Sequence, residues 1–477
     1  MSIEVEKKEL DSPNGHLEPP SSPKAAIARL PIWRQRRYQL PALFVAFAFV
    51  VAVVGNNLLA NQYTAEGAAR QYLSALQSGD ATKAWDAIKV AAPTSPATAM
   101  YIDRPALEAA FAVGKPDIKG FTVMGTRVLG PSTTSIGFAY DTSAGSKRAN
   151  LIAEHSGQTH FGFYPAWHLA ITPTTLRIAL PKGSNGISID GKSIALPVGN
   201  STIAVLPLLH KVQFNGTPML ASQTVSLDAF MSQGQSVTYQ PKLTAAGLDT
   251  AKAAIKAGLD ACSQKTSPNP AADGGCPQSA STSRAKSGQW RVVGDPSQDL
   301  TVSFDQSLNA YGVGHYQMVF AYEDYGAQHE VAAGGYRAAL ALTPTDITVG
   351  SISPTRDAPD LKRPAGVTDQ AAKDLVAQGF AQCAKATVSL LADCPQYLAD
   401  AMTSNISWSM SGDPGAGAIV SFDSTTGIVA VQGNVPMTAS YLSGRTPKTR
   451  ASFARTYVAY LLWDGQALQL VTIVGVL

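Results

Sequence analysis

The sequence predicts an α+β fold class in which one N-terminal transmembrane helix precedes several domains that place helices before antiparallel sheets. Three observations predict it: an uncharged apolar run at residues 40–60, a change from helical to alternating periodicity within residues 62–172, and motifs that occur twice in about the last 240 residues. The predicted order after the helix is an α+β domain, a small β domain and two tandem helix-plus-antiparallel-sheet repeats.

Roughly 417 residues follow the apolar run, which is enough for three or four domains of about 100 to 150 residues. The predicted boundaries are a cytoplasmic tail at 1–37, a transmembrane helix at 38–60, an α+β domain at 62–172, a small β domain at 173–235, and disulfide-containing α+β repeats at 236–355 and 356–477. The tail is rich in proline and mixed in charge, which is typical of disorder.

The apolar run carries no charged side chain and follows the basic residues Arg34, Arg36 and Arg37. About 20 helical residues cross the roughly 30 Å hydrocarbon core, so residues 38–60 are expected to contact the lipid bilayer as a single pass. Basic flanks stay on the inner side, which predicts a cell-membrane protein with a cytoplasmic N-terminus and an extracytoplasmic remainder. A cleaved signal peptide and a buried core helix are the alternatives.

All four cysteines lie beyond the apolar run, where an oxidising compartment preserves disulfides. Of the three possible connectivities, the internal repeat favours Cys262 with Cys276 and Cys383 with Cys394. A four-thiolate metal site is the alternative, but zinc sites usually have two residues between paired cysteines, and neither pair has that spacing.

The repeat rests on motifs that recur with one constant shift of 118 residues. The shift maps Cys276-Pro277-Gln278 onto Cys394-Pro395-Gln396, Trp290 onto Trp408, residues 294–296 onto 412–414, and residues 302–305 onto 420–423. A helix with apolar residues at helical spacing ends at Cys262 in the first copy and at Cys383 in the second. In each copy the motifs therefore predict a helix, a disulfide loop and a sheet, in that order.

Asp295 and Asp413 are interpreted as turn residues, and Trp290 and Trp408 as core residues.

The membrane-proximal segment predicts two helices within residues 64–88, separated by Ser78-Gly79-Asp80, and alternating strands after about residue 118. The pattern Tyr-Leu-x-Ala-Leu-x-x-Gly-Asp-x-x-x-Ala-Trp at residues 72–85, with a later strand containing Trp167, resembles the NTF2-like domains of bacterial envelope proteins. Residues 187–192 and 206–214 are similar to the small β domain that accompanies them in the TcaA family of teicoplanin-resistance-associated proteins.

The resemblance covers residues 35–225 and implies a single-span anchor that carries modules into the cell-wall space. Members of the family are linked to cell-wall stress and glycopeptide sensitivity. The family typically begins with a cysteine zinc ribbon, whereas residues 1–37 contain no cysteine. A zinc-dependent cytoplasmic role therefore does not carry over, and the resemblance implies no catalytic residue.

A candidate metal or proton-transfer site consists of Glu154, His155, His160 and His168, on neighbouring predicted strands. Alternation could place His160 and His168 on one face, but solvated or hairpin histidines are the favoured interpretation. The chain has no nucleophile elbow, zincin motif, P-loop or dinucleotide fingerprint. No catalytic residue and no cofactor is therefore predicted.

Charged residues are only 15% of the chain and the net charge is +3, which gives no electrostatic basis for nucleic-acid binding. The duplicated module contains no catalytic motif, and a repeated fold multiplies binding surface, so a binding function is favoured over catalysis. The expected function is a membrane-anchored extracytoplasmic binding or sensing protein of the bacterial cell envelope, non-catalytic, with a cell-wall polymer or an envelope protein as partner. The alternatives are an envelope enzyme that uses the NTF2-like pocket, and a scaffold subunit of a membrane complex.

Overall fold

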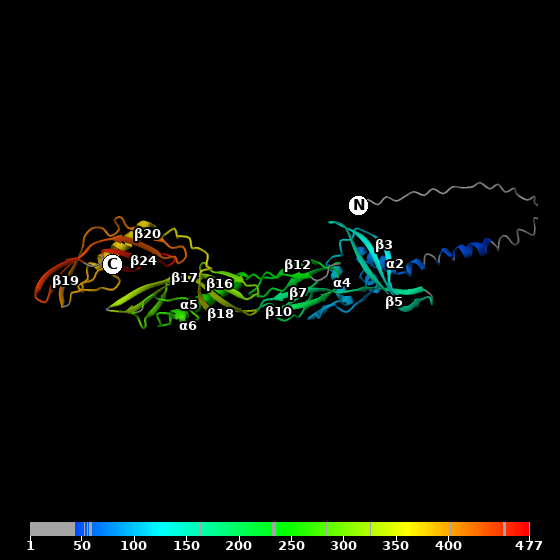
Figure 1. The fold of residues 1–477 in the computed structure, drawn as a ribbon, viewed down its shortest axis with the longest axis horizontal. Helices are drawn as coiled ribbons and strands as arrows, with labels where there is room; N and C mark the ends of the chain where they lie inside the picture. The colour runs from blue at the N-terminus through cyan, green and yellow to red at the C-terminus, as the bar shows by residue number, and fades with distance from the viewer. Residues whose placement is uncertain are drawn as a thin grey trace, which may run out of the picture.

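The computed structural model describes residues 43–51, 53–54, 56, 60–162, 164–230, 235–282, 284–324, 326–400, 402–451 and 455–476. The fold is mixed α+β with 44% strand and 20% helix, so sheets rather than helices set the architecture. Figure 1 shows the units following one another along the longest axis, with α2 near one end and β19 near the other.

No helix among these residues is both long enough and apolar enough to cross a membrane. The transmembrane helix in the predicted fold class is therefore wrong. A span needs about 20 continuous apolar helical residues, and no helix among the described residues meets that requirement. The predicted tail at 1–37 and residues 38–42, 52, 55 and 57–59 lie outside the described residues.

The first domain packs three helices on one curved sheet. The helices are α2 (Ala65–Ser78), α3 (Ala81–Asp86) and α4 (Arg104–Val113). Each begins where a side-chain oxygen accepts a hydrogen bond from a backbone N–H of the first turn: Thr64 caps α2, Asp80 caps α3 and Asp103 caps α4. The sheet has the order β1-β6-β5-β4-β3, formed by β1 (Ile88–Val90), β3 (Gly120–Gly130), β4 (Thr133–Thr142), β5 (Gly145–His160) and β6 (Tyr164–Ile171).

Two small sheets form the second unit. One has the order β13-β7-β10-β2 and the other β12-β11-β8-β9. Their strands are β2 (Ala99–Tyr101), β7 (Thr174–Leu180), β8 (Ile187–Ile189), β9 (Lys192–Ile194), β10 (Gly199–Val205), β11 (Leu209–Phe214), β12 (Gln223–Asp228) and β13 (Gln235–Val237). Strand β2 lies before α4 in the sequence yet pairs in parallel with β10, which ties the first two units together.

The first repeat places one long helix on a continuous sheet. Its elements are α5 (Ala245–Ser263), α6 (Pro270–Asp273), β14 (Gln289–Val292), β15 (Thr301–Phe304), β16 (Ala310–Glu323), β17 (Ala327–Leu342) and β18 (Ile347–Thr355). Both β14 and β15 pair with the long strand β16. The buried face of α5, with Ala251, Ile255 and Leu259, packs into the core of this repeat.

The second repeat has the same order but two sheets. Its elements are α7 (Asp369–Cys383), β19 (Thr403–Met410), β20 (Ile419–Phe422), β21 (Val429–Asn434), β22 (Met437–Ser443), β23 (Thr446–Ala451), β24 (Thr456–Trp463) and β25 (Leu468–Val476). Strands β21 and β22 together occupy the place of the single strand β16. Pro436 lies at the break between them, because proline has no N–H to donate to a strand ladder.

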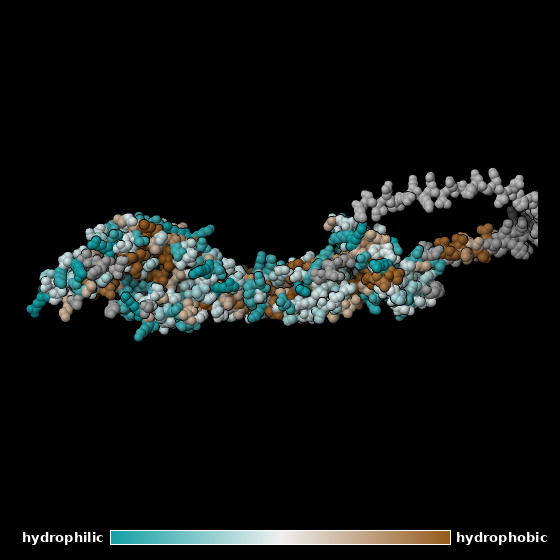
Figure 2. Space-filling view, viewed as in Figure 1, coloured by the Kyte–Doolittle hydropathy of each residue, from teal (hydrophilic) through white to brown (hydrophobic). Residues whose placement is uncertain are grey.

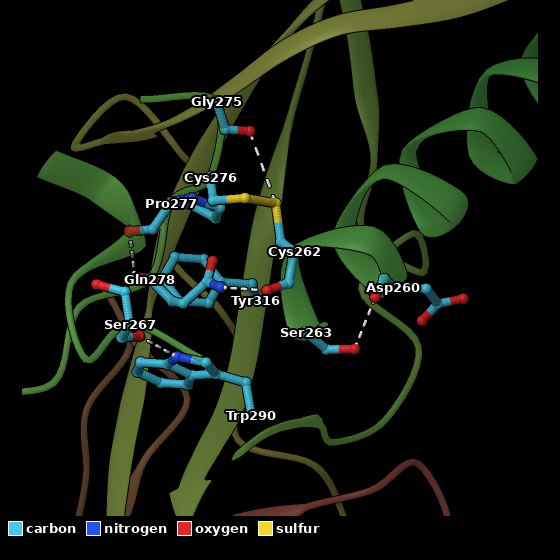
Figure 3. Close-up of a disulfide and its surroundings, with 10 residues drawn as sticks. All are labelled: Asp260, Cys262, Ser263, Ser267, Gly275, Cys276, Pro277, Gln278, Trp290 and Tyr316. Atoms are coloured by element: carbon cyan, nitrogen blue, oxygen red, sulfur yellow. Dashed lines mark hydrogen bonds between the residues drawn. A yellow bond between two sulfur atoms is a disulfide. The ribbon is translucent and has the colours of Figure 1, made fainter. Parts of the chain in front are cut away.

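The predicted disulfide bonds are confirmed: Cys262 pairs with Cys276 and Cys383 with Cys394. Figure 3 shows the first disulfide, where the Gln278 amide donates to the carbonyl of Cys262 and Trp290 donates to the carbonyl of Ser267. Gln396 and Trp408 make the corresponding bonds in the second repeat, to Cys383 and Val388. Two disulfides are typical of an oxidising, extracellular compartment.

Candidate functional site

A cleft with a volume of about 380 Å³ lies where the two repeats meet. Its size falls in the range of small-molecule sites. The first repeat contributes Val293, Gly294, Asp295, Pro296, Gln298, Asp299, His315 and Gln317, and residues 361–465 contribute Leu361, Lys362, Pro364, Phe422, Gly427, Trp463 and Gly465. Figure 2 shows hydrophobic residues gathered over the second repeat, around the position of β24 in Figure 1.

Direct contacts between the repeats hold the walls of the cleft in place. Leu462 of β24 is fully buried and packs with Val293 and Val319 of the first repeat. The Gln317 amide donates to the carbonyl of Thr426 over 3.3 Å. These contacts are apolar or neutral, so they do not depend on the charge state of the cleft.

His315 and Asp299 form a hydrogen-bonded pair in the wall of the cleft. The Nδ1 atom of His315 lies 2.5 Å from Oδ2 of Asp299, and the backbone N–H of His315 donates to Oδ1 of the same carboxylate over 3.3 Å. His315 is 6% exposed, and its Nε2 atom is buried without a hydrogen-bond partner among the described residues. A buried polar atom without a partner costs about 1 to 3 kcal/mol, which marks this nitrogen as a place where a ligand group can bind favourably.

Asp295 is the second carboxylate of the cleft. Its Oδ1 accepts hydrogen bonds from the Ser297 backbone N–H over 2.9 Å and from the Ser297 hydroxyl over 2.7 Å. Partial burial works to raise the pKa of Asp295, but these hydrogen bonds, together with Lys256 and Lys252, hold it below the ordinary value. Asp295 is therefore ionised near neutral pH and acts as a hydrogen-bond acceptor.

Three His–Asp pairs among the described residues differ in the surroundings of the second ring nitrogen. In the second unit, His210 is fully buried: Nδ1 lies 2.7 Å from Asp190, and Nε2 lies 2.7 Å from the carbonyl of Leu206. His329 is partly exposed, and its Nδ1 lies 2.6 Å from Asp393 across the junction of the repeats. Of the three, His315 alone combines a buried ring with a buried Nε2 that has no partner among the described residues.

The second repeat keeps the fold around this position without the pair. Gly314 lies opposite Tyr336, and Gly433 lies opposite Tyr457, so the strands are equivalent at these positions. The residue after Gly433 is Asn434, and the shift of 118 residues puts Gly417 at the position of Asp299. The His315–Asp299 pair is therefore not required by the fold of the repeat, which favours a functional role for it.

The candidate residues from the sequence are divided between two faces of one sheet. Glu154 on β5 lies opposite His168 on β6, whereas His155 lies opposite Trp167 on the other face, with ring centroids 5.5 Å apart. His160 lies opposite Tyr164, about 13 Å along β6 from His168.

The described residues contain no cluster of three or more His, Cys, Asp or Glu side chains that could hold a metal ion. The four candidates therefore do not converge on one point. All four cysteines form disulfide bonds and none of them lines the cleft: the pairs are Cys262–Cys276 and Cys383–Cys394.

Sequence reasoning missed His315 and Asp299, and it treated Asp295 only as a turn residue. The signal was present in the repeat itself: a histidine and a carboxylate in the first copy replace an asparagine and a glycine in the second. Side chains that differ between two copies of one fold are not needed for that fold, so they are candidates for a functional role. No protein family, no curated protein and no solved structure matches this chain.

Proposed function

We propose that this protein is a non-catalytic, extracytoplasmic binding protein of the cell envelope, and that the cleft between its two repeats takes a small ligand. The observation that carries the proposal is His315, which lines a cleft shared by both repeats and whose buried Nε2 has no hydrogen-bond partner among the described residues. The two disulfides support a place outside the cytoplasm. The resemblance to the TcaA family supports the cell envelope.

The state of the carboxylates supports binding over acid–base turnover. Asp299 accepts hydrogen bonds from both the backbone and the ring of His315, and Asp295 accepts two from Ser297. A general acid needs a raised pKa, whereas the hydrogen bonds of Asp295 lower it. Both side chains are thus positioned as fixed acceptors.

Fluorine NMR of the full chain labelled with 5-fluorotryptophan tests whether the cleft binds anything. Trp463 lines the cleft, whereas Trp408 lies in the core of the second repeat and serves as the internal reference. A low-molecular-mass digest of bacterial cell envelope is expected to shift the Trp463 resonance and to leave that of Trp408 in place.

Gln298 is an exposed residue of the cleft, and Gln298→Phe is expected to block the shift by filling the space. The matched control is Ala416→Phe, because Ala416 is the exposed counterpart of Gln298 in the second repeat and does not line the cleft. A Trp463 resonance that never responds, or one that responds equally in Gln298→Phe, would contradict the proposed function.

A further inference from the structure

The hydrogen on the His315 ring is placed by its neighbour. A carboxylate can only accept, and Oδ2 of Asp299 lies 2.5 Å from Nδ1, so Nδ1 carries the hydrogen. In the neutral ring the other nitrogen, Nε2, then has a free lone pair and is a hydrogen-bond acceptor. A ligand group that pairs with the buried Nε2 atom must therefore be a hydrogen-bond donor.

The charges around the cleft argue against an ionic ligand. Both oxygens of Asp299 are engaged by His315, and Asp295 is engaged by Ser297 with Lys252 and Lys256 nearby. Asp299 thus has no oxygen left for a ligand ammonium group, and the two lysines offset the charge of Asp295. The two carboxylates outnumber Lys362 in the cleft lining, and this excess of negative charge disfavours an anion as well.

The lining also has an apolar part. It includes Pro296, Leu361, Phe422 and Trp463, beside the amide side chains of Gln298 and Gln317. A ligand that fits such a wall presents both C–H surface and uncharged donors. Saccharides have this combination, because their rings carry hydroxyl groups around an apolar face.

Resting on the proposed function, we infer that the cleft takes a neutral, hydroxyl-rich ligand of the saccharide class, and that Nε2 of His315 accepts a hydrogen bond from one of its hydroxyl groups. Asp299 is the positioning residue that keeps the hydrogen on Nδ1. The second repeat, with Asn434 and Gly417 at these places, lacks the site.

Calorimetric titration of the full chain with four probes tests the ligand class. The probes are chitobiose and cellobiose as neutral saccharides, cadaverine as a cation and glucose 6-phosphate as an anion. At least one neutral disaccharide is expected to bind and to shift the Trp463 fluorine resonance. Binding of cadaverine or glucose 6-phosphate without binding of a neutral disaccharide would overturn the inference.

The role of Nε2 is tested with His315→Asn, which installs the residue that the second repeat has on the equivalent strand. Loss of one hydrogen bond is expected to weaken disaccharide binding by about tenfold. The matched control, Asn434→Ala, is expected to leave binding unchanged. Unweakened binding in His315→Asn would overturn the assignment of Nε2, and intact Trp290 and Trp408 resonances establish that the variant is folded.

Nitrogen-15 NMR of the imidazole provides a readout that a purely structural role would not move. The Nε2 resonance of His315 is expected at the position of a bare acceptor nitrogen and is expected to shift when the disaccharide is added. Asp299→Asn replaces the acceptor with an amide that can donate to Nδ1, so the hydrogen is expected to move to Nε2 and disaccharide binding to fall. An Nε2 that carries hydrogen in the unmodified protein would overturn the inference.

The two proposals fail in different ways. A Trp463 resonance that responds to the envelope digest, together with no binding of either neutral disaccharide, overturns the saccharide class and leaves the proposed function standing. A Trp463 resonance that responds to neither the digest nor any probe overturns both.

Discussion

At the scale of single residues, the buried tyrosines couple the sheet of each repeat to the Asp-Pro turn. Tyr336 donates to the carbonyl of Pro296 over 2.8 Å, and Tyr457 donates to the carbonyl of Pro414. Each ring lies over a glycine of the neighbouring strand, Gly314 under Tyr336 and Gly433 under Tyr457. There is no room for a side chain at Gly314, because a Cβ atom there would lie 2.7 Å from the hydroxyl oxygen of Tyr336. Any larger residue at that glycine would displace the ring.

A third buried tyrosine, Tyr316, gives a prediction for alkaline pH. Burial raises the pKa of Tyr316 from 10.0 to about 12, and its hydroxyl donates to the carbonyl of Pro277 over 3.0 Å. The folded state keeps the proton to higher pH than the unfolded state, so the stabilisation is fully present below pH 10 and is lost as the pH rises towards 12. The native protein is expected to exceed Tyr316→Phe by about 1 kcal/mol in free energy of unfolding near neutral pH.

Urea denaturation at a series of pH values checks this prediction. The difference between the native protein and Tyr316→Phe is expected to shrink steadily above pH 10, while the other buried tyrosines affect both proteins alike. A difference that stays constant from neutral to strongly alkaline pH would show that Tyr316 does not contribute in this way.

At the scale of elements, the first turns of α5 and α7 have the same cap but different neighbours. Thr244 accepts from the N–H of Gly247 over 2.9 Å, and Thr368 accepts from the N–H of Ala371 over 3.1 Å. Helix α5 begins against the preceding β unit, where the N–H of Thr244 donates to the carbonyl of Met219 over 3.0 Å. A Cβ atom at Gly247 would lie only 2.3 Å from that carbonyl oxygen.

The glycine in the first turn of α5 is therefore expected to resist a change that helices normally favour. Alanine is ordinarily better than glycine in a helix by about 1 kcal/mol. Gly247→Ala is instead expected to destabilise the protein by about 1 to 3 kcal/mol, since the backbone of Met219 must move. Thermal and urea denaturation measure the change, with Ala371→Gly as the matched variant in α7, expected to cost no more than about 1 kcal/mol. Stabilisation by Gly247→Ala would contradict the close approach.

At the scale of the whole molecule, the chain is an extended row of units, and the junction between the two repeats is the one that forms the candidate site (Figure 1). Leu462 and the His329–Asp393 pair hold this junction, the latter with a second hydrogen bond of 3.1 Å from the backbone N–H of His329 to Asp393. Leu462, His329 and Asp393 do not themselves line the cleft, although Val293, which packs with Leu462, does.

Leu462→Ala is expected to loosen the two repeats from each other. Removing a fully buried leucine side chain costs about 2 to 5 kcal/mol, and here part of the cost falls on the junction. Hydrogen exchange is expected to rise in β14 and β16 of the first repeat as well as in the second. The control is Leu461→Ala, whose side chain is equally buried but packs in the core of the second repeat alone, so faster exchange should stay in that repeat. Equal exchange patterns in the two variants would argue against Leu462 as the coupling residue.

Sequence patterns correctly predicted the features that depend on neighbouring residues, such as helix caps, turns and core positions. Thr64 caps α2, and Gly79 ends it in the left-handed conformation that favours glycine. Trp290 and Trp408 lie in the cores, and Asp295 and Asp413 each accept a backbone N–H in the turn. The apolar run predicted a membrane span, whereas no helix among the described residues is both long enough and apolar enough to cross a membrane. Among the candidate site residues, His155 lies on the other face of the sheet from Glu154 and His168, because neighbouring residues of a strand point to opposite faces.

The sequence by itself determined the helix caps, the alternating strands and the disulfide pairing, since each depends on residues close together in the chain or on one motif repeated at a constant shift. Only the tertiary structure decided the candidate site. His315 on β16 meets Asp299 from the loop between β14 and β15, and Trp463 and Lys362 reach the same cleft from the second repeat. The physical reason is that the packing of two separate cores around Leu462 sets these distances, and periodicity along the chain carries no information about how two finished surfaces fit together.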